Sequence, residues 1–254
     1  MTAQLSIKQR YFFPQQLVSI NWDNIPKHIA MIPDGNRRWA MQQELSTKEG
    51  HEEGGNTLIE IVKAACELNI EVMTFYLFST ENWARPELEI TALMWLLHVF
   101  LLDNLETMLD YGIKLHTIGT LEKLPEYVQE TIRQTKIATE NCQTIDMVLA
   151  INYGSRDEMC RAVRSIAKEV DIGMISPEDI SESLIASHLD TAPWKDPDLL
   201  IRTSGEKRLS NYLLWQLSYS EIHVTDVLWP NFRPNDLLEA LLNYQTRHRR
   251  LGKQ

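Results

Sequence analysis

The sequence predicts an α/β fold in which helices flank a central, mostly parallel sheet within a single domain. Three observations lead to this prediction. Short apolar runs alternate along the chain with longer amphipathic stretches, which is the pattern of strands alternating with helices. The runs contain few polar residues, as expected of parallel strands covered on both faces. The 254 residues, 44% of them hydrophobic, suffice for one large core, and no Pro/Gly/Ser-rich linker or internal repeat divides them.

Each expected strand is a short run rich in Ile, Val, Leu, Met or Phe. The first three runs read HIAMIP, EVMTFYLF and IKLHTI, and the last three read IDMVLAI, DLLIRT and IHVTD. β-Branched and aromatic side chains favour the extended conformation in a pleated sheet. In chain order, we therefore expect strands at residues 28–33, 71–78, 113–118, 145–151, 198–203 and 222–226.

The expected helices lie between these strands and after the last one. In most of them apolar residues recur three or four positions apart, which makes one face apolar. The segment 87–111 differs because its centre, LMWLLHVFLL, is apolar on all sides. Either it packs between the core and a dimer interface, or one of its faces lines a tunnel for a hydrocarbon. The helices are expected at residues 55–69, 87–111, 126–140, 155–170, 177–189 and 234–250.

Charge and composition restrict the possible ligands and the location. A formal net charge of −10 argues against general nucleic-acid binding, which needs a broad basic surface, so an anionic ligand must be held by a local group of arginines. The N-terminus lacks the apolar core of a signal peptide, and the most apolar window, residues 93–102, is too short to span a bilayer. Three scattered cysteines suit a reducing compartment. We therefore expect a cytoplasmic protein, for which a peripheral membrane contact stays open.

Four polar loops follow expected strands directly. They read PDGNRRWA, FSTENWARP, NYGSRDE and RTSGEKRLSN, and each contains at least one arginine. In open parallel sheets, ligands bind beyond the carboxyl ends of the strands, so these loops should meet in one cleft. Arginine and amide donors in such a cleft indicate a site for a phosphorylated ligand.

The loop PDGNRRWA contains the clearest chemistry. Asp34 has two interpretations: it caps the following helix, or it binds a metal. The turn Gly35–Asn36 and the pair Arg37–Arg38 provide backbone amides and guanidinium groups for a phosphate. A carboxylate would repel that phosphate unless a divalent cation lay between them, so Asp34 implies Mg²⁺.

A second basic loop, RTSGEKRLSN, follows the strand 198–203. Arg202, Lys207, Arg208 and Ser210 form either a solvated surface loop or a second anion site at the same sheet edge. In FSTENWARP, hydroxyl, amide, indole and guanidinium groups are available, although a loop tryptophan usually packs in the core. Taken alone, His51 and Glu221 are typical structural or surface residues.

Three long segments together resemble one enzyme family. HIAMIPDGNRRWA, TFYLFSTENWARP and DLLIRTSGEKRLSNYLLWQLSYSEIHVTDVLWPNF are similar to signature segments of the cis-prenyltransferases, the undecaprenyl diphosphate synthase family. The similarity runs from His28 to Gly252, with the segments in the family's order. It implies an N-terminal extension over residues 1–27 and a catalytic domain over residues 28–254, with a hydrophobic tunnel and a homodimer.

The resemblance also implies an activity. It is the Mg²⁺-dependent condensation of isopentenyl diphosphate with farnesyl or geranyl diphosphate, which forms a new Z double bond. The default product is undecaprenyl diphosphate, and a short- or medium-chain Z-prenyl diphosphate is the alternative. Three other functions remain open: head-to-middle prenyl coupling on the same fold, a non-catalytic partner subunit, and a phosphohydrolase with Asp34 as nucleophile.

Matched by position, the resemblance assigns roles to single residues. Asp34 and Asn82 are the expected catalytic residues, and Asp34 and Glu221 are the expected metal ligands. Arg250 and Gly252, in a C-terminal Arg-X-Gly, are expected to reach into the partner's site. The expected allylic diphosphate and loop contacts are Gly35, Asn36, Arg37, Arg38, Trp39, His51, Ser79, Trp83 and Arg85; those of isopentenyl diphosphate are Arg202, Arg208 and Ser210.

This sequence departs from the family pattern at three positions. Thr47 stands where many relatives have an arginine, and Lys48 is a possible substitute. Lys207 stands where some bacterial members have histidine. Leu77 stands where many long-chain relatives have a small tunnel residue, so a bulky side chain there predicts a short or medium product.

Overall fold

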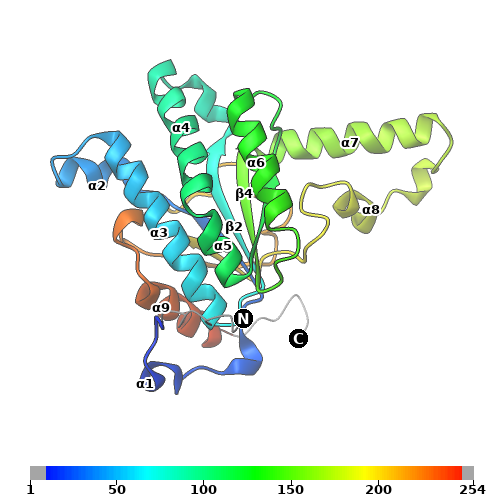
Figure 1. The fold of residues 1–254 in the computed structure, drawn as a ribbon. Helices are drawn as coiled ribbons and strands as arrows, with labels where there is room; N and C mark the ends of the chain where they lie inside the picture. Colours follow the sequence, from blue (N-terminus) through cyan, green and yellow to red (C-terminus); the bar gives the residue numbers. More distant parts are fainter. Residues whose placement is uncertain (1–9, 248–254) are drawn as a thin grey trace, which may run out of the picture.

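The computed structural model describes residues 10–247 and contains one parallel sheet of six strands in the order β3-β4-β2-β1-β5-β6 (Figure 1). Every strand pair in it is parallel. All six expected strands are present, with ends that differ from the expected ones by at most two residues. Their bounds are β1 His28–Ile32, β2 Val72–Ser79, β3 Ile113–Ile118, β4 Ile145–Tyr153, β5 Leu199–Arg202 and β6 Glu221–Val224.

Helices connect and cover these strands. Several short ones lie in loops that the sequence pattern did not identify, among them α1, α2 and the 3₁₀ turns. The α-helices are α1 Pro14–Leu17, α2 Asn36–Gln42, α3 Thr47–Glu67, α4 Glu87–Asp103, α5 Leu105–Tyr111, α6 Glu126–Ala138, α7 Ser155–Asp171, α8 Glu182–Ser187 and α9 Pro234–Gln245. The 3₁₀ helices are η1 Trp22–Asn24, η2 Thr80–Ala84, η3 Pro177–Asp179 and η4 Trp229–Asn231.

Helix α3 begins at Thr47, eight residues before the expected start at residue 55. A capping box starts it: Ser46 Oγ accepts from the Glu49 amide, and Glu49 Oε2 accepts from the Ser46 amide at 2.9 Å. The glycines in KEGHEEGG hid this helix in the sequence. They serve close packing instead, because a Cβ on Gly50 would lie 2.4 Å from the Asn36 carbonyl oxygen.

The expected helix 87–111 is broken into α4 and α5, whose axes differ by 48°. At the break, the Phe100 carbonyl oxygen accepts from the Asn104 amide at 3.2 Å and from Asn104 Nδ2 at 2.9 Å, so the Asn104 side chain adds a local bond to the last turn of α4. Among the described residues, no single helix is long and apolar enough to cross a membrane, although this bent pair reaches the required length and composition.

Two further differences in helix bounds lie towards the C-terminus. The expected helix 177–189 is replaced by η3 and the short helix α8. The expected helix 234–250 is α9, which ends at Gln245, and residues 248–250 lie outside the described part of the chain.

Apolar side chains cover both faces of the sheet, as the sequence predicts. On one face Met31, Phe75 and Leu149 pack against helices α3, α4, α5, α6 and α9. On the other face, Tyr153 and Tyr212 belong to a smaller cluster formed with the segment between β5 and β6. Residues 10–27, expected as an extension, contribute Phe12, Ile20 and Ile25 to the first cluster.

Candidate active site

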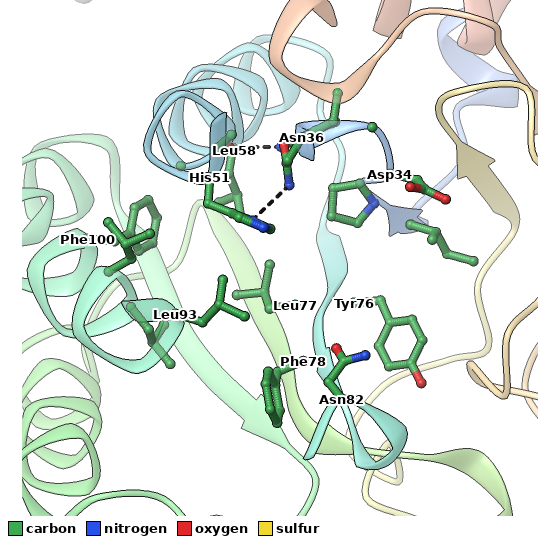
Figure 2. A pocket seen from close by; sticks show the side chains of 18 of the residues that line it. Asp34, Asn36, His51, Leu58, Tyr76, Leu77, Phe78, Asn82, Leu93 and Phe100 are labelled. Carbon is green, nitrogen blue, oxygen red and sulfur yellow. Dashed lines mark hydrogen bonds between the residues drawn. The ribbon is translucent and has the colours of Figure 1, made fainter. Parts of the chain in front are cut away.

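The cleft lies where the chain leaves β1 and β5. These strands are neighbours in the sheet, yet β1 is followed along the chain by β2 on one side and β5 by β6 on the other. Such a reversal opens a crevice at the carboxyl ends of the two strands. Here the crevice opens into a cavity of about 960 Å³, and Asp34 and Arg202 both line it (Figure 2).

The cavity has one polar and one apolar end. Most of the site residues expected from the sequence line it, so three of the four polar loops meet in one cleft, whereas the loop NYGSRDE contributes no lining residue. At the polar end these are Asp34, Gly35, Asn36, Arg37, Arg38, His51, Ser79, Asn82, Arg85, Arg202, Arg208 and Ser210. Among the lining residues that the sequence did not single out are Glu206 and Trp229.

Asp34 is held by contacts that exclude the capping interpretation. The N-cap of α2 is Gly35, with a φ of 116°, and no side chain caps the helix. The Asp34 carboxylate instead accepts from Arg202 Nη2 at 2.8 Å, and its amide donates to Thr203 Oγ1 at 2.8 Å. Glycine is required at position 35, because a Cβ there would also lie only 3.0 Å from Leu228.

Arg202 is the centre of the second candidate anion site. It is only 4% exposed, and its Nη1 donates to Ser210 Oγ at 3.0 Å and to the Arg208 carbonyl oxygen. Its Nε is buried without a hydrogen-bond partner among the described residues. A buried, unpaired N–H is costly, so an anionic oxygen in the cavity would be a favourable partner.

The first candidate anion site consists of Arg37, Arg38 and Arg85, and these arginines are paired with two glutamates that the sequence analysis missed. Glu89, in the first turn of α4, accepts from Arg37 and, at 3.1 Å, from Arg85. Glu206 lies 3.4 Å from Arg38. Burial of Glu89 opposes its ionisation, but the bonds from Arg37 and Arg85 outweigh it and lower its pKa. Both glutamates neutralise positive charge on the arginines of the cavity.

His51 is neutral at physiological pH. Burial, followed by the charges of Arg85 and Arg37, lowers its pKa to about 4. Its Nδ1 is hydrogen-bonded to Asn36 Nδ2 at 3.3 Å, and the other ring nitrogen is Nε2. This Nε2 is buried without a partner among the described residues, and the ring points into the cavity (Figure 2). His51 therefore provides an uncharged polar group there.

Asn82 offers a donor. Its Oδ1 accepts from the Ser79 amide at 3.1 Å, closing the turn that starts η2. Among the described residues, no group accepts from its Nδ2, and the side chain lies beside Tyr76 and Phe78 in Figure 2. The amide nitrogen is thus the part of Asn82 that can meet a ligand.

The apolar end runs between α3 and α4. Helix α4 contributes Leu93, Leu97 and Phe100, and Leu77 projects from β2 between Leu93 and Leu58 (Figure 2). The apolar character of α4 on this side is thereby explained, and the tunnel interpretation of this helix is supported. Polar and apolar ends in one cavity fit an amphiphilic ligand.

Several expected site residues lie elsewhere. Trp39 Nε1 donates to Asn231 Oδ1, and Trp83 Nε1 donates to Asn152 Oδ1, each at 2.8 Å. These bonds support the two loops that carry the tryptophans. Lys48 lies over the ring of Trp95, 4.4 Å from its centroid, and does not line the cavity. Its role as a substitute for an arginine at Thr47 stays a prediction.

Glu221 does not meet Asp34 within one chain. Glu221 begins β6 in register with Leu199, the first residue of β5, so it lies at the amino ends of the strands, whereas Asp34 follows the carboxyl end of β1. Its carboxylate pairs with Arg247 at 2.8 Å. A role in metal binding stays a prediction that would need a second subunit. Arg250 and Gly252 lie outside the described residues.

Residues 10–247 contain no group of three or more His, Cys, Asp or Glu side chains that could hold a metal alone. A single carboxylate is nevertheless compatible with Mg²⁺, which is commonly bound by one or two carboxylates together with substrate phosphates. Asp34 fits that pattern, since it lines a cavity whose arginines would hold the phosphates.

Comparison with known sequences agrees with this site. Residues 32–252 match the sequence model of the family described as putative undecaprenyl diphosphate synthase. An isoprenyl transferase of Chlamydia trachomatis serovar D is 44% identical over 253 residues, which are 98% of this chain and 99% of that protein. A ditrans,polycis-undecaprenyl-diphosphate synthase of Micrococcus luteus, described as (2E,6E)-farnesyl-diphosphate specific, is 44% identical and covers 92% of this chain and 94% of that one.

Two solved structures share the fold. Lavandulyl diphosphate synthase from Lavandula x intermedia, in complex with dimethylallyl diphosphate, has a TM-score of 0.88 at 36% identity. A probable undecaprenyl diphosphate synthase from Campylobacter jejuni has a TM-score of 0.75 at 33% identity. Each match covers 91% of this chain and 100% of the other.

Proposed function

The chain belongs to the undecaprenyl diphosphate synthase family of isoprenyl transferases, and from this premise we propose that it condenses isopentenyl diphosphate with an allylic diphosphate to a Z-polyprenyl diphosphate. The observation that carries the proposal is the cavity itself. Two basic groups lie at its polar end, one for each diphosphate, and an apolar channel beside them accommodates the growing hydrocarbon.

The residues at the polar end have separate tasks. Arg37, Arg38 and Arg85, with the neutral His51, bind the allylic diphosphate and stabilise the charge that builds on it as it leaves. Arg202, Arg208 and Ser210 anchor the diphosphate of isopentenyl diphosphate. Fixing both substrates beside one another places the alkene next to the allylic carbon, which is an orientation effect.

Mg²⁺ is part of the proposal. Asp34 would hold it at the polar end, next to the two diphosphates. When bound, the cation supplies Lewis-acid stabilisation of the leaving diphosphate. Before any ligand binds, the Asp34 carboxylate forms an ion pair with Arg202, which compensates the negative charge of Asp34.

Three further features of the proposal concern assembly and location. Helix α7 projects from the body of the molecule (Figure 1), with Val163, on this helix, and Met174, just beyond it, more than 60% exposed, which supports a homodimer. Exposed leucines and a tryptophan also recur at every seventh position along α4 and α5, which supports a peripheral membrane contact by a cytoplasmic enzyme. These residues are Leu88, Trp95, Leu102 and Leu109.

One incubation tests the proposed reaction. Purified protein receives Mg²⁺, radiolabelled isopentenyl diphosphate and either farnesyl or geranyl diphosphate, and the products are separated by chain length. We expect labelled polyprenyl diphosphates that disappear when EDTA is added. No condensation with either starter would refute the proposed reaction, and full activity in EDTA would refute the metal.

Product identity distinguishes the second candidate. The fold similarity to a lavandulyl diphosphate synthase raises specialised prenyl coupling as an alternative. Asp34, Asn36 and Asn82 all line the cavity, and this intact set favours ordinary elongation. A branched product formed from dimethylallyl diphosphate would favour the alternative, and a linear Z product would exclude it.

A further inference from the structure

Three loops from different strands converge behind the cavity, at the carboxyl end of β4. Gly154 lies at the centre of this junction. A Cβ at this position would lie 2.6 Å from Thr80 Oγ1 and 2.8 Å from Asn211 Nδ2. The absence of a side chain on Gly154 therefore lets the η2 loop and the loop between β5 and β6 approach one another.

Asn211 joins all three loops. Its Nδ2 donates to Glu81 Oε1 at 2.8 Å, in the η2 loop. Its Oδ1 accepts from the Arg156 amide at 3.0 Å, and its carbonyl oxygen accepts from the Ser155 amide at 2.8 Å. Each polar group of this side chain thus has a partner on a different segment, which fixes its orientation.

The backbone around Asn211 is held in an uncommon conformation. Ser210, Asn211 and Leu213 have φ angles of 54°, 63° and 44°, in the left-handed region that costs energy for residues other than glycine. Such a conformation persists only where surrounding contacts impose it. The bonds from Ser155 and Arg156 at the start of α7 are contacts of this kind.

The two loops joined by Asn211 carry different parts of the site. Ser210, its neighbour in the chain, accepts from Arg202 in the proposed isopentenyl diphosphate site. Glu81, its partner, directly precedes Asn82, and Trp83 is fixed by its bond to Asn152. The η2 loop is thereby held on both sides of Asn82.

We propose that Asn211 is a positioning residue that couples the isopentenyl diphosphate loop to the loop carrying Asn82. Asn211 does not line the cavity. Through its bond to Glu81, it sets the distance between Ser210 and Asn82. The inference rests on the proposed condensation reaction, and it concerns the geometry of that site.

The test reverses the hydrogen bond between positions 211 and 81, so that the donor and the acceptor change places. Asn211→Asp keeps the acceptor for Arg156 and places a negative charge near the N-terminus of α7, where it is favourable, so the variant should fold. Its carboxylate then faces that of Glu81. We expect kcat to fall by about tenfold while KM for the allylic diphosphate changes less than about threefold.

Adding Glu81→Gln to Asn211→Asp restores one donor and one acceptor in reversed order. We expect this double variant to recover kcat to within about threefold of the unmodified protein. Glu81→Gln alone keeps an acceptor for Asn211 and should lose little. Asn235→Asp, on the exposed start of α9, is the matched control for the added charge.

Hydrogen–deuterium exchange of the amides in residues 79–85 provides a measurement independent of activity. Exchange should become faster in Asn211→Asp and return to its original rate in the double variant. Failure of the double variant to restore either kcat or exchange would overturn the coupling. An inactive unmodified protein would instead refute the proposed reaction, and the exchange data alone would then decide the coupling.

Discussion

At the scale of single residues, the site is held ready by internal ion pairs. Asp34, Glu89 and Glu206 neutralise arginines that line the same cavity. Like charges close together in a partly buried site repel, so these acids favour the assembled cleft before ligands bind. In the proposed reaction, the diphosphates would replace the carboxylates as partners of the same guanidinium groups.

Asp34→Ala should remove most of the activity. The change deletes the proposed Mg²⁺ ligand, which we expect to lower kcat by about two orders of magnitude or more. Arg202 keeps its bonds to Ser210 and the Arg208 carbonyl oxygen, so the circular dichroism spectrum should be unchanged. Near-normal turnover in this variant would contradict the metal assignment.

Arg202→Ala and Arg208→Ala should act mainly on isopentenyl diphosphate. Each removes a charge-assisted bond of about 1.5–3 kcal/mol, which corresponds to a rise in KM of about 10- to 100-fold. Arg37→Ala is the matched variant, and it should affect the allylic substrate instead. Steady-state kinetics with each substrate varied in turn measure both effects, and an effect of Arg202→Ala confined to the allylic substrate would reverse the two sites.

The residues that line the polar end of the cavity could be predicted from the sequence, whereas their supports could not. Asp34, Arg37 and Arg202 stand out because they follow apolar strands directly. In the sequence, Glu89 looks like an ordinary acidic residue in the first turn of a helix. A negative charge there stabilises the helix even if the residue has no function. The contacts that give Glu89 and Asn211 their roles join segments far apart in the chain, and no local pattern records them.

At the scale of elements, α4 and α3 form the walls of the apolar channel. Leu77 projects from β2 between these helices, and Phe100 narrows the far part, where a Cβ on Gly55 would lie 3.4 Å from its ring. Bulky side chains in the walls reduce the space for a growing chain. The length of the product should therefore depend on them.

Leu77→Ala should lengthen the products. It removes volume at a point that Figure 2 places inside the cavity, so additional isoprene units gain space. Leu88→Ala is the matched control, because Leu88 lies on the outer side of α4 and is 87% exposed. Chain-length separation of labelled products measures the change, and unchanged lengths in Leu77→Ala would refute the volume argument.

Strands were easier to predict than helix ends. The apolar runs of β1 to β6 stand out because both faces are buried. The start of α3 was hidden by three glycines whose purpose is close contact with α2 and α4, and at the break after Asp103 the side chain of Asn104 bonds back to the Phe100 carbonyl oxygen. Both features arise from packing or from one hydrogen bond, which the spacing of apolar residues does not reveal.

At the scale of the whole molecule, a buried histidine links stability to pH. His28 is 2% exposed at the start of β1 and bonds to Thr74 Oγ1 and the Lys195 carbonyl oxygen. Burial lowers its pKa from 6.5 to about 4. Between these values the unfolded chain binds a proton that the folded chain does not, so stability falls as the pH falls.

The free energy of unfolding should therefore decrease by about 3 kcal/mol through His28 as the pH is lowered from 7 to 4. Urea unfolding at a series of pH values measures it. His28→Gln should make the decrease shallower. His188→Gln is the control of opposite sign, because a bond to Glu169 raises the pKa of His188, and an equal slope in both variants would refute the assignment.

The order of the strands also decides when the site exists during synthesis. β1 pairs with β5, and Asp34 bonds to Arg202, 168 positions later in the chain. The whole segment from β1 to β4 is therefore synthesised before β5, which forms the other half of the crevice. The nascent chain can pair four strands early, but it acquires affinity for two diphosphates only near the end of translation.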